Sequence, residues 1–124
     1  MRIDNTTDKT QFWQERYSKW GHTGWSSPVL YAYDQHERLA LIRQQLSQLE
    51  PPPKTVLDFG CGSGDFSRLV LENGCRVWGY DLYVDPKIAH PKFTYINDRE
   101  AFLRQPQEID LILSVTVLDH ILDD

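Results

Sequence analysis

The spacing of apolar residues changes near the middle of the chain. Before residue 50 the spacing is helical, and four apolar side chains fall at i, i+3, i+7 and i+10 on one stripe: Leu39, Ile42, Leu46 and Leu49. This stripe predicts a helix over about 29–49, which the proline run 51–53 ends because proline lacks an amide donor. A shorter helix is expected from residue 11. We therefore expect residues 1–50 to form a helical cap on a core of residues 51–124.

From Lys54 onward, short apolar runs alternate with helical patterns. The runs predict four strands, over 55–59, 76–80, 93–96 and 109–115. The helices between them are expected at 65–73 and at 98–104, the second with Asn97 as its N-cap, and another begins within 118–122. The last strand is almost continuously apolar, which predicts burial on both faces. Strands separated by helices pair in parallel through right-handed crossovers, so the fold class is α/β.

A glycine turn follows the first predicted strand, in the sequence VLDFGCGSGDF over 56–66. Glycine permits positive φ and close approach of a ligand to the backbone. At a helix N-terminus such a turn is expected to offer backbone N–H groups to an anion. Its spacing is G-x-G-x-G, whereas a dinucleotide-binding loop has G-x-G-x-x-G. The flanking acids Asp58 and Asp65 would repel a pyrophosphate and favour a ligand that carries both an ammonium group and a carboxylate.

An acidic residue ends the second predicted strand. Asp81 lies 21 residues after Gly60 (81 − 60), the position from which a carboxylate accepts hydrogen bonds from ribose hydroxyls in doubly wound sheets. Nicotinamide dinucleotides and S-adenosylmethionine both contain such a ribose. Asp81 therefore predicts nucleoside binding without choosing between them, and a solvated loop aspartate is the alternative.

The segment 56–64 resembles motif I of the S-adenosylmethionine-dependent methyltransferases with the Rossmann-like fold. The resemblance implies a parallel sheet of order 3-2-1-4, part of a seven-stranded fold, with S-adenosylmethionine as cofactor. It implies that Leu82 packs on the adenine, that Asp98 accepts from the adenine amino group, and that the backbone near Ser114 lies along the methionine. The residues assigned to the cofactor by this resemblance are Asp58, Gly60, Cys61, Gly62, Gly64, Asp81, Leu82, Asp98 and Ser114. For Asp98 a simple helix-N-terminal role is an equal alternative.

Two further groups of residues are candidates for chemistry near the ends of the chain. Asp119 and His120 form a candidate acid–base pair, since histidine titrates near neutral pH, although His120 more often packs. Arg16 is a candidate partner for the cofactor carboxylate. Six aromatic residues of the N-terminal region have two alternative roles. Their rings either attract the cationic sulfonium of the cofactor or pack the helical cap on the sheet. The rings in question are those of Trp13, Tyr17, Trp20, Trp25, Tyr31 and Tyr33.

Composition narrows the partners of the chain. The net charge is −5 over 124 residues, without a cluster of Lys or Arg, which argues against nucleic acid and favours a small-molecule methyl acceptor. The two cysteines make no disulfide framework, and we expect reduced thiols in the cytoplasm. No apolar run suggests a membrane partner. His22 and His36 lack ligand-spaced partners, so no metal site is expected.

Only four of the seven strands of the family are predicted. The fourth would leave an apolar edge, and we expect two chains to pair through it about a two-fold axis. The chain is then either a fragment of a longer enzyme or a short protein completed by a second copy. Two other functions stay open: a non-catalytic cofactor-binding or dimerisation module, and a nicotinamide-dependent oxidoreductase.

Overall fold

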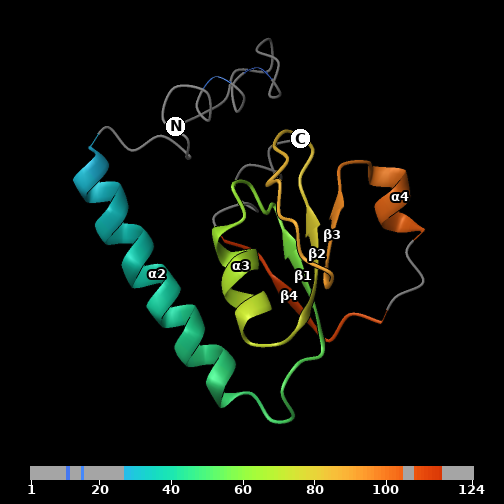
Figure 1. The fold of residues 1–124 in the computed structure, drawn as a ribbon, viewed down its shortest axis with the longest axis horizontal. Coiled ribbons are helices and arrows are strands. Elements are labelled where there is room, and N and C mark those ends of the chain that lie inside the picture. The colour runs from blue at the N-terminus through green and yellow to red at the C-terminus, as the bar shows by residue number, and fades with distance from the viewer. Residues whose placement is uncertain (1–10, 12–14, 16–26, 105–107, 116–124) are drawn as a thin grey trace.

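The four strands form one parallel sheet with helices on both faces (Figure 1). The structure is a computed structural model and describes residues 11, 15, 27–104 and 108–115. The strand order is β3-β2-β1-β4, which confirms the predicted α/β class and the order inferred from the family resemblance. The elements are α2 (Pro28–Gln48), β1 (Thr55–Phe59), α3 (Asp65–Glu72), β2 (Arg76–Tyr80), β3 (Phe93–Ile96), α4 (Arg99–Leu103) and β4 (Leu111–Leu113).

The register of the sheet brings the carboxyl ends of β1, β2 and β4 to one edge. Asp58 of β1 is opposite Gly79 of β2 and Leu113 of β4, and Phe59 is opposite Tyr80. The bounds of β1, β2 and β3 agree with the sequence prediction, whereas β4 is shorter than the predicted 109–115. Loops that follow these strands therefore meet at one edge, where ligands of open α/β sheets bind.

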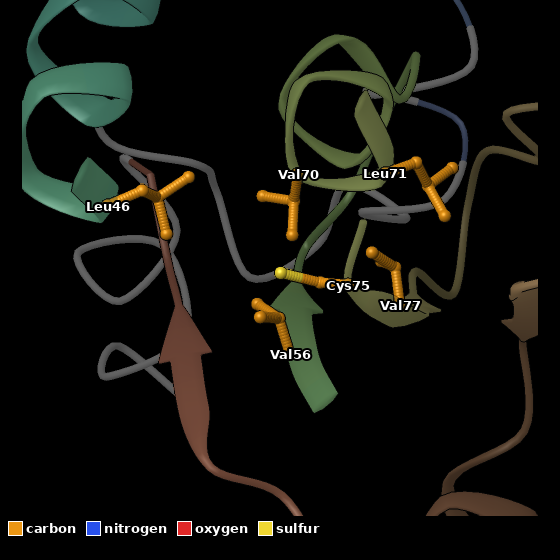
Figure 2. Close-up of a cluster of buried hydrophobic side chains, with 6 residues drawn as sticks. All are labelled: Leu46, Val56, Val70, Leu71, Cys75 and Val77. Carbon is orange, nitrogen blue, oxygen red and sulfur yellow. The ribbon is translucent and has the colours of Figure 1, made fainter. Parts of the chain in front are cut away.

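One face of the sheet packs against α2 and α3. Six buried side chains converge there, as Figure 2 shows: Leu46, Val56, Val70, Leu71, Cys75 and Val77. The helical stripe predicted in α2 is used only near its end, because Leu46 is buried and Ile42 is partly buried, while Leu49 is 37% exposed. Burial of these side chains holds α2 against α3 and so sets one wall of the site described below.

The opposite face of the sheet is covered less completely. Phe59, Tyr80 and Phe102 stack there, with ring centroids of Tyr80 and Phe102 4.8 Å apart. Leu57 is buried beneath them, but its β4 neighbour Ile112 is 63% exposed. The prediction that the fourth strand is buried on both faces is therefore wrong for the described chain. In the described residues only the five-residue helix α4 packs on this face, where it contacts β3 and its Phe102 also reaches Phe59 of β1 and Tyr80 of β2.

The helix ends show how local sequence sets the boundaries. The Ser27 hydroxyl accepts from the Leu30 amide at the start of α2. The cap of α4 is Asp98, whose Oδ1 accepts from the Glu100 amide at 2.9 Å, so the prediction of Asn97 as cap is wrong by one residue. A carboxylate at this position also interacts favourably with the helix dipole, which accounts for the preference. The helices predicted from residue 11 and within 118–122 lie largely or wholly outside the described residues.

None of the helices in the described part of the chain has the length and apolar character needed to cross a bilayer.

Candidate functional site

The glycine turn between β1 and α3 has the backbone conformation that its sequence predicts. Gly60, Gly62 and Gly64 have φ values of 80°, 52° and 86°, all in the region that side chains disfavour. A Cβ added at Gly64 would lie 2.8 Å from Ile88 Cδ1 and 2.8 Å from Pro86 Cβ, so this position also lacks space. Three of the five residues of the turn, 60–64, are thus glycines, and the turn packs closely against the loop after β2.

The amide groups of this turn are used within the chain. Gly60 and Cys61 both donate to the carbonyl of Tyr80, at 2.7 and 3.0 Å, and Gly64 donates to the Cys61 carbonyl at 2.9 Å. The Gly62 amide donates to Asp81 Oδ2 at 2.9 Å. The expectation of N–H groups that are free for an anion is therefore wrong for these four amides, because they bond within the turn and to the end of β2 and the residue after it. The turn offers a ligand close backbone approach instead of an anion cradle.

Asp81 organises the loop beside the turn. Besides the Gly62 amide on Oδ2, its Oδ1 accepts from the amides of Tyr83 and Val84 at 2.8 and 3.0 Å. The Tyr95 hydroxyl donates to its main-chain carbonyl at 2.9 Å, and burial together with Asp81 raises the pKa of Tyr95 to about 12. Since a carboxylate has about four acceptor positions, one on Oδ2 stays available to a ligand.

A pocket lies between α2 and the first turn of α3. Ten residues line it: Tyr31, Gln35, Arg38, Asp58, Gly60, Cys61, Ser63, Asp65, Phe66 and Val115. Asp58 is only 2% exposed, and its Oδ2 accepts from the fully buried Ser67 hydroxyl at 2.6 Å. Burial raises the pKa of Asp58 to about 6, against the hydrogen bond from Ser67, which lowers it; the charge of Asp81 raises it further. The pocket floor therefore carries a carboxyl group that titrates close to neutral pH.

The wall from α2 is tied to α3 through Asp65. Its Oδ2 accepts from Gln35 Nε2 at 3.0 Å and lies 3.4 Å from the Tyr31 hydroxyl and 3.3 Å from Ser63 Oγ. Burial, followed by the charge of Asp65, raises the pKa of Tyr31 to about 12, so its hydroxyl stays protonated. The main role of Asp65 in the structure is therefore to hold α2 beside the pocket through Tyr31 and Gln35.

A cation from α2 also reaches the pocket. Arg38 lines it, and its Nε lies 2.9 Å from Asp34 Oδ2, one helical turn earlier. This ion pair orients a guanidinium on a wall that otherwise carries Asp58 and Asp65. The pocket thus presents both signs of charge, an arrangement that suits a zwitterionic ligand.

Cys61 is excluded as a nucleophile. Burial raises the pKa of its thiol well above the usual range, and the charges of Asp58 and Asp81 raise it further. The thiol is buried against β2, where a Cβ at Gly79 would meet Cys61 Sγ at 3.2 Å and Phe93 Cζ at 2.6 Å. The Cys61 side chain therefore packs the glycine turn against β2.

The remaining predicted site residues fall into two groups. Leu82 is 47% exposed beside Asp81, and Asp98 is exposed at the start of α4. In the described chain the buried hydroxyl of Ser114, which follows β4, has no hydrogen-bond partner. The other predictions lie outside the described residues: Arg16, Tyr17, Asp119 and His120.

Sequence reasoning named Tyr31 of α2 as a candidate but missed Gln35 and Arg38, which line the pocket from the same helix. Tyr31, Gln35 and Arg38 recur at i, i+4 and i+7, which places them on one helix face, and this spacing was the available signal. Tyr33, by contrast, is 66% exposed, so the prediction that it packs the cap on the sheet is wrong. Trp13, Trp20 and Trp25 lie outside the described residues. No group of three or more His, Cys, Asp or Glu side chains within the described ranges is arranged to hold a metal ion.

Comparison with known proteins agrees with this geometry. A family model described as "Methyltransferase domain" matches residues 31–123. The chain is 30% identical over 95 residues to the ubiquinone biosynthesis O-methyltransferase of Coxiella burnetii (strain RSA 493 / Nine Mile phase I), covering 69% of this chain and 39% of that protein. It is 35% identical over 89 residues to the ribosomal protein L11 methyltransferase of Vibrio campbellii, covering 66% of this chain and 30% of that protein.

The matched region of the family model includes every element that builds the pocket, from Tyr31 in α2 to Val115 after β4. The chain spans about two fifths of the length of the O-methyltransferase that it matches. The sheet order, the glycine turn and the family match together show that the chain belongs to the class I S-adenosylmethionine-dependent methyltransferase family.

Proposed function

We propose that this chain is the cofactor-binding part of an S-adenosylmethionine-dependent methyltransferase that acts on a small molecule. The observation that carries the proposal is the position of Asp81 beside the glycine turn, next to a pocket that holds Asp58 and Arg38. The family implies the methyl donor, and the geometry supports a site for its two halves, a nucleoside and a charged amino acid.

The nucleoside half would lie along the loop after β2. The acceptor position left on Asp81 Oδ2 suits a ribose hydroxyl, and the half-exposed Leu82 side chain offers an apolar surface for adenine. Asp98 uses Oδ1 to cap α4, so Oδ2 can accept from the adenine amino group. Asp81 and Leu82 directly follow β2, and Asp98 is the N-cap of α4.

The amino-acid half would lie in the pocket between α2 and α3. Asp58 is the expected partner of the ammonium group, and Arg38 of the carboxylate, since an oriented guanidinium binds carboxylates well. The unpartnered Ser114 hydroxyl lies after β4, where the resemblance places the methionine chain. The residues present therefore fit the cofactor.

S-adenosylmethionine supplies an activated methyl group for in-line displacement at carbon. The work left to the protein is to position the acceptor and to exclude water. Asp119 and His120 remain the predicted acid–base pair for acceptors that must lose a proton. The proposal also places the protein in the cytoplasm, where the unpaired Cys61 and Cys75 would stay reduced.

The relatives do not decide the acceptor, because their names refer to ubiquinone biosynthesis in one case and to ribosomal protein L11 in the other. A small molecule is preferred because the chain is acidic and lacks a basic cluster. Release of S-adenosylhomocysteine by the full-length protein, measured against a metabolite panel, tests this choice.

Two other functions compete with this proposal. A nicotinamide-dependent oxidoreductase is disfavoured by the G-x-G-x-G spacing and by the acids beside the turn. A non-catalytic cofactor-binding module is the other alternative. Such a module would bind the cofactor without turnover.

Calorimetric titration with S-adenosylmethionine, S-adenosylhomocysteine and NADH distinguishes these functions. We expect saturable binding of the first two and none of NADH. The variant Arg38→Gln should weaken both adenosyl ligands by about tenfold, the usual value of one charge-assisted hydrogen bond. Absence of binding by either adenosyl ligand, or preference for NADH, would refute the proposal.

Pairing of two chains through β4 is a further part of the proposal. Ile112 is 63% exposed on this edge strand, and an isologous contact would cover it in both copies. Sedimentation velocity at micromolar concentration should show a dimer that Ile112→Lys dissociates. Leu103→Lys is the matched control, because Leu103 is 69% exposed on α4, which packs against the opposite edge strand β3. A wild-type monomer would contradict the pairing.

A further inference from the structure

Asp58 is almost fully buried, which is unusual for a residue that lines a ligand pocket. It lies on the central strand β1, is 2% exposed, and still lines the pocket between α2 and α3. Most buried carboxyl groups are paired with a cation, since an isolated charge away from water is costly. The Asp58 side chain instead accepts a hydrogen bond from the neutral hydroxyl of Ser67, which is itself fully buried on α3.

Among the described residues, no cation is paired with Asp58. The titratable or charged groups that line the pocket or act on Asp58 come from α2, the glycine turn, α3 and the end of β2: Tyr31, Arg38, Cys61, Asp65 and Asp81. Arg38 is ion-paired to Asp34, and Asp81 adds negative charge. A carboxyl group in these surroundings holds its proton more tightly than usual until a positive charge enters the pocket.

We propose that Asp58 couples cofactor binding to proton release: in mildly acidic solution, the neutral acid of the free protein becomes a carboxylate when a positively charged ligand occupies the pocket. This inference rests on the proposed function, since the ligand charge is that of the ammonium or sulfonium group of S-adenosylmethionine. The O–H bond of the Asp58 carboxyl group breaks, its proton goes to solvent, and the electron pair stays on the oxygen that faces the cation.

Ser67 acts in this coupling as a positioning residue. Its hydroxyl donates to Oδ2 and so favours the charged form of Asp58. The balance between burial and this hydrogen bond places the pKa of Asp58 at about 6, inside the range where a change of pH alters ligand affinity. Removal of the hydroxyl should move the transition to higher pH without removing it.

The test is calorimetry of S-adenosylmethionine binding to the intact chain from pH 5 to 8, in buffers of different ionisation enthalpy. We expect release of between half a proton and one proton per ligand at pH 5.5 and nearly none at pH 7.5. The affinity should rise with pH, by up to about tenfold per unit below the transition, and then level off. S-adenosylhomocysteine should behave alike if the ammonium group drives the coupling, and should release no proton if the sulfonium does.

Three variants separate the proposal from a general pH effect. Asp58→Asn should abolish the proton release, and Ser67→Ala should shift the midpoint upward. Ser47→Ala is the matched control, because Ser47 is an exposed α2 residue whose hydroxyl contacts only the Gln44 carbonyl, and it should leave the midpoint unchanged. Binding that does not vary with pH, or proton release that persists in Asp58→Asn, would overturn the inference. Absence of binding at every pH would instead refute the proposed function.

Discussion

The two ends of the sheet hold aspartates in opposite circumstances. At the carboxyl end, Asp58 is buried at the pocket, and burial raises its pKa to about 6. At the amino end, Asp110 is exposed, and its Oδ2 accepts from the amides of Lys54 and Thr55 at 2.8 and 2.9 Å. These two amides lower the pKa of Asp110. An aspartate carboxylate thus accepts two backbone hydrogen bonds at the amino end, whereas at the carboxyl end it is buried without a paired cation among the described residues.

This difference separates residues that stabilise the fold from residues that serve the site. Asp110 ties β4 to β1, a task that needs only two nearby amides. Asp58 is most easily explained by a ligand, because its burial lowers the stability of the charged form. Asp81 combines both tasks, since it organises the loop and keeps one acceptor position open.

The largest effect is expected from Asp81→Ala. The variant removes three acceptor contacts that fix the turn and the loop, together with the expected ribose contact. The affinity for S-adenosylmethionine should fall by about 100-fold or more, the value of two hydrogen bonds to a charged group. Isothermal calorimetry measures the change directly.

The control for that variant is Asp85→Ala in the same loop. Asp85 is exposed, and its Oδ1 accepts from the Lys87 amide at 2.8 Å. Its loss should change the affinity by less than about threefold. Equal effects of the two variants would mean that Asp81 acts only through general loop order.

Asp58→Asn should make the ligand-free protein more stable while weakening cofactor binding. A carboxyl pKa that is raised in the folded state contributes stability below the unfolded value of 3.8, and this contribution is lost as pH rises through about 6. The amide avoids that loss, so at pH 7.5 the variant should gain about 1–3 kcal/mol in the free energy of unfolding. Urea denaturation at several pH values checks the sign, and a less stable variant at pH 7.5 would contradict it.

Asp110→Ala should have the smallest effect on the site and the opposite effect on stability. A lowered pKa contributes stability above the unfolded value, and this contribution disappears as pH falls through the folded value. The melting temperature at pH 7 should therefore drop by a few degrees, and the difference from wild type should vanish in acid. Because the sites are distant, the affinity for the cofactor should change by less than about twofold. A larger change in cofactor affinity would contradict the assignment of Asp110 to the fold and of Asp58 to the site.

Much of the sheet layer was predictable because its signals are local. The bounds of β1, β2 and β3 agree with the apolar runs, and the positive φ values at Gly60, Gly62 and Gly64 follow from the alternate glycines. The exposure of Ile112 was not predictable from an apolar run, since the run does not say which neighbours are present to cover it. Burial is a property of the assembled layers, whereas strand formation is mostly a property of the segment.

The site was predictable in its residue types and less so in its contacts. The sequence patterns correctly predicted that Asp58 and Asp81 lie at the carboxyl edge of the sheet. They also predicted that the glycine amides are free for a ligand, whereas these amides bond to Tyr80, Asp81 and Cys61. The sequence analysis also missed Gln35 and Arg38. The apolar positions of a helix show which face packs on the core, but they do not show which polar residues of the same helix line a pocket. Contacts between α2 and α3 depend on long-range packing that spacing alone does not define.

The most direct measurement is an amide ¹H–¹⁵N NMR titration of the intact chain with S-adenosylmethionine. We expect the shifts to concentrate at the carboxyl end of the sheet, on the amides of Gly60, Gly62, Gly64 and Asp81. The amides of Lys54, Thr55 and Asp110 at the amino end should barely move. Shifts that are absent, or that are as large at the amino end as at the carboxyl end, would contradict the assignment of the site.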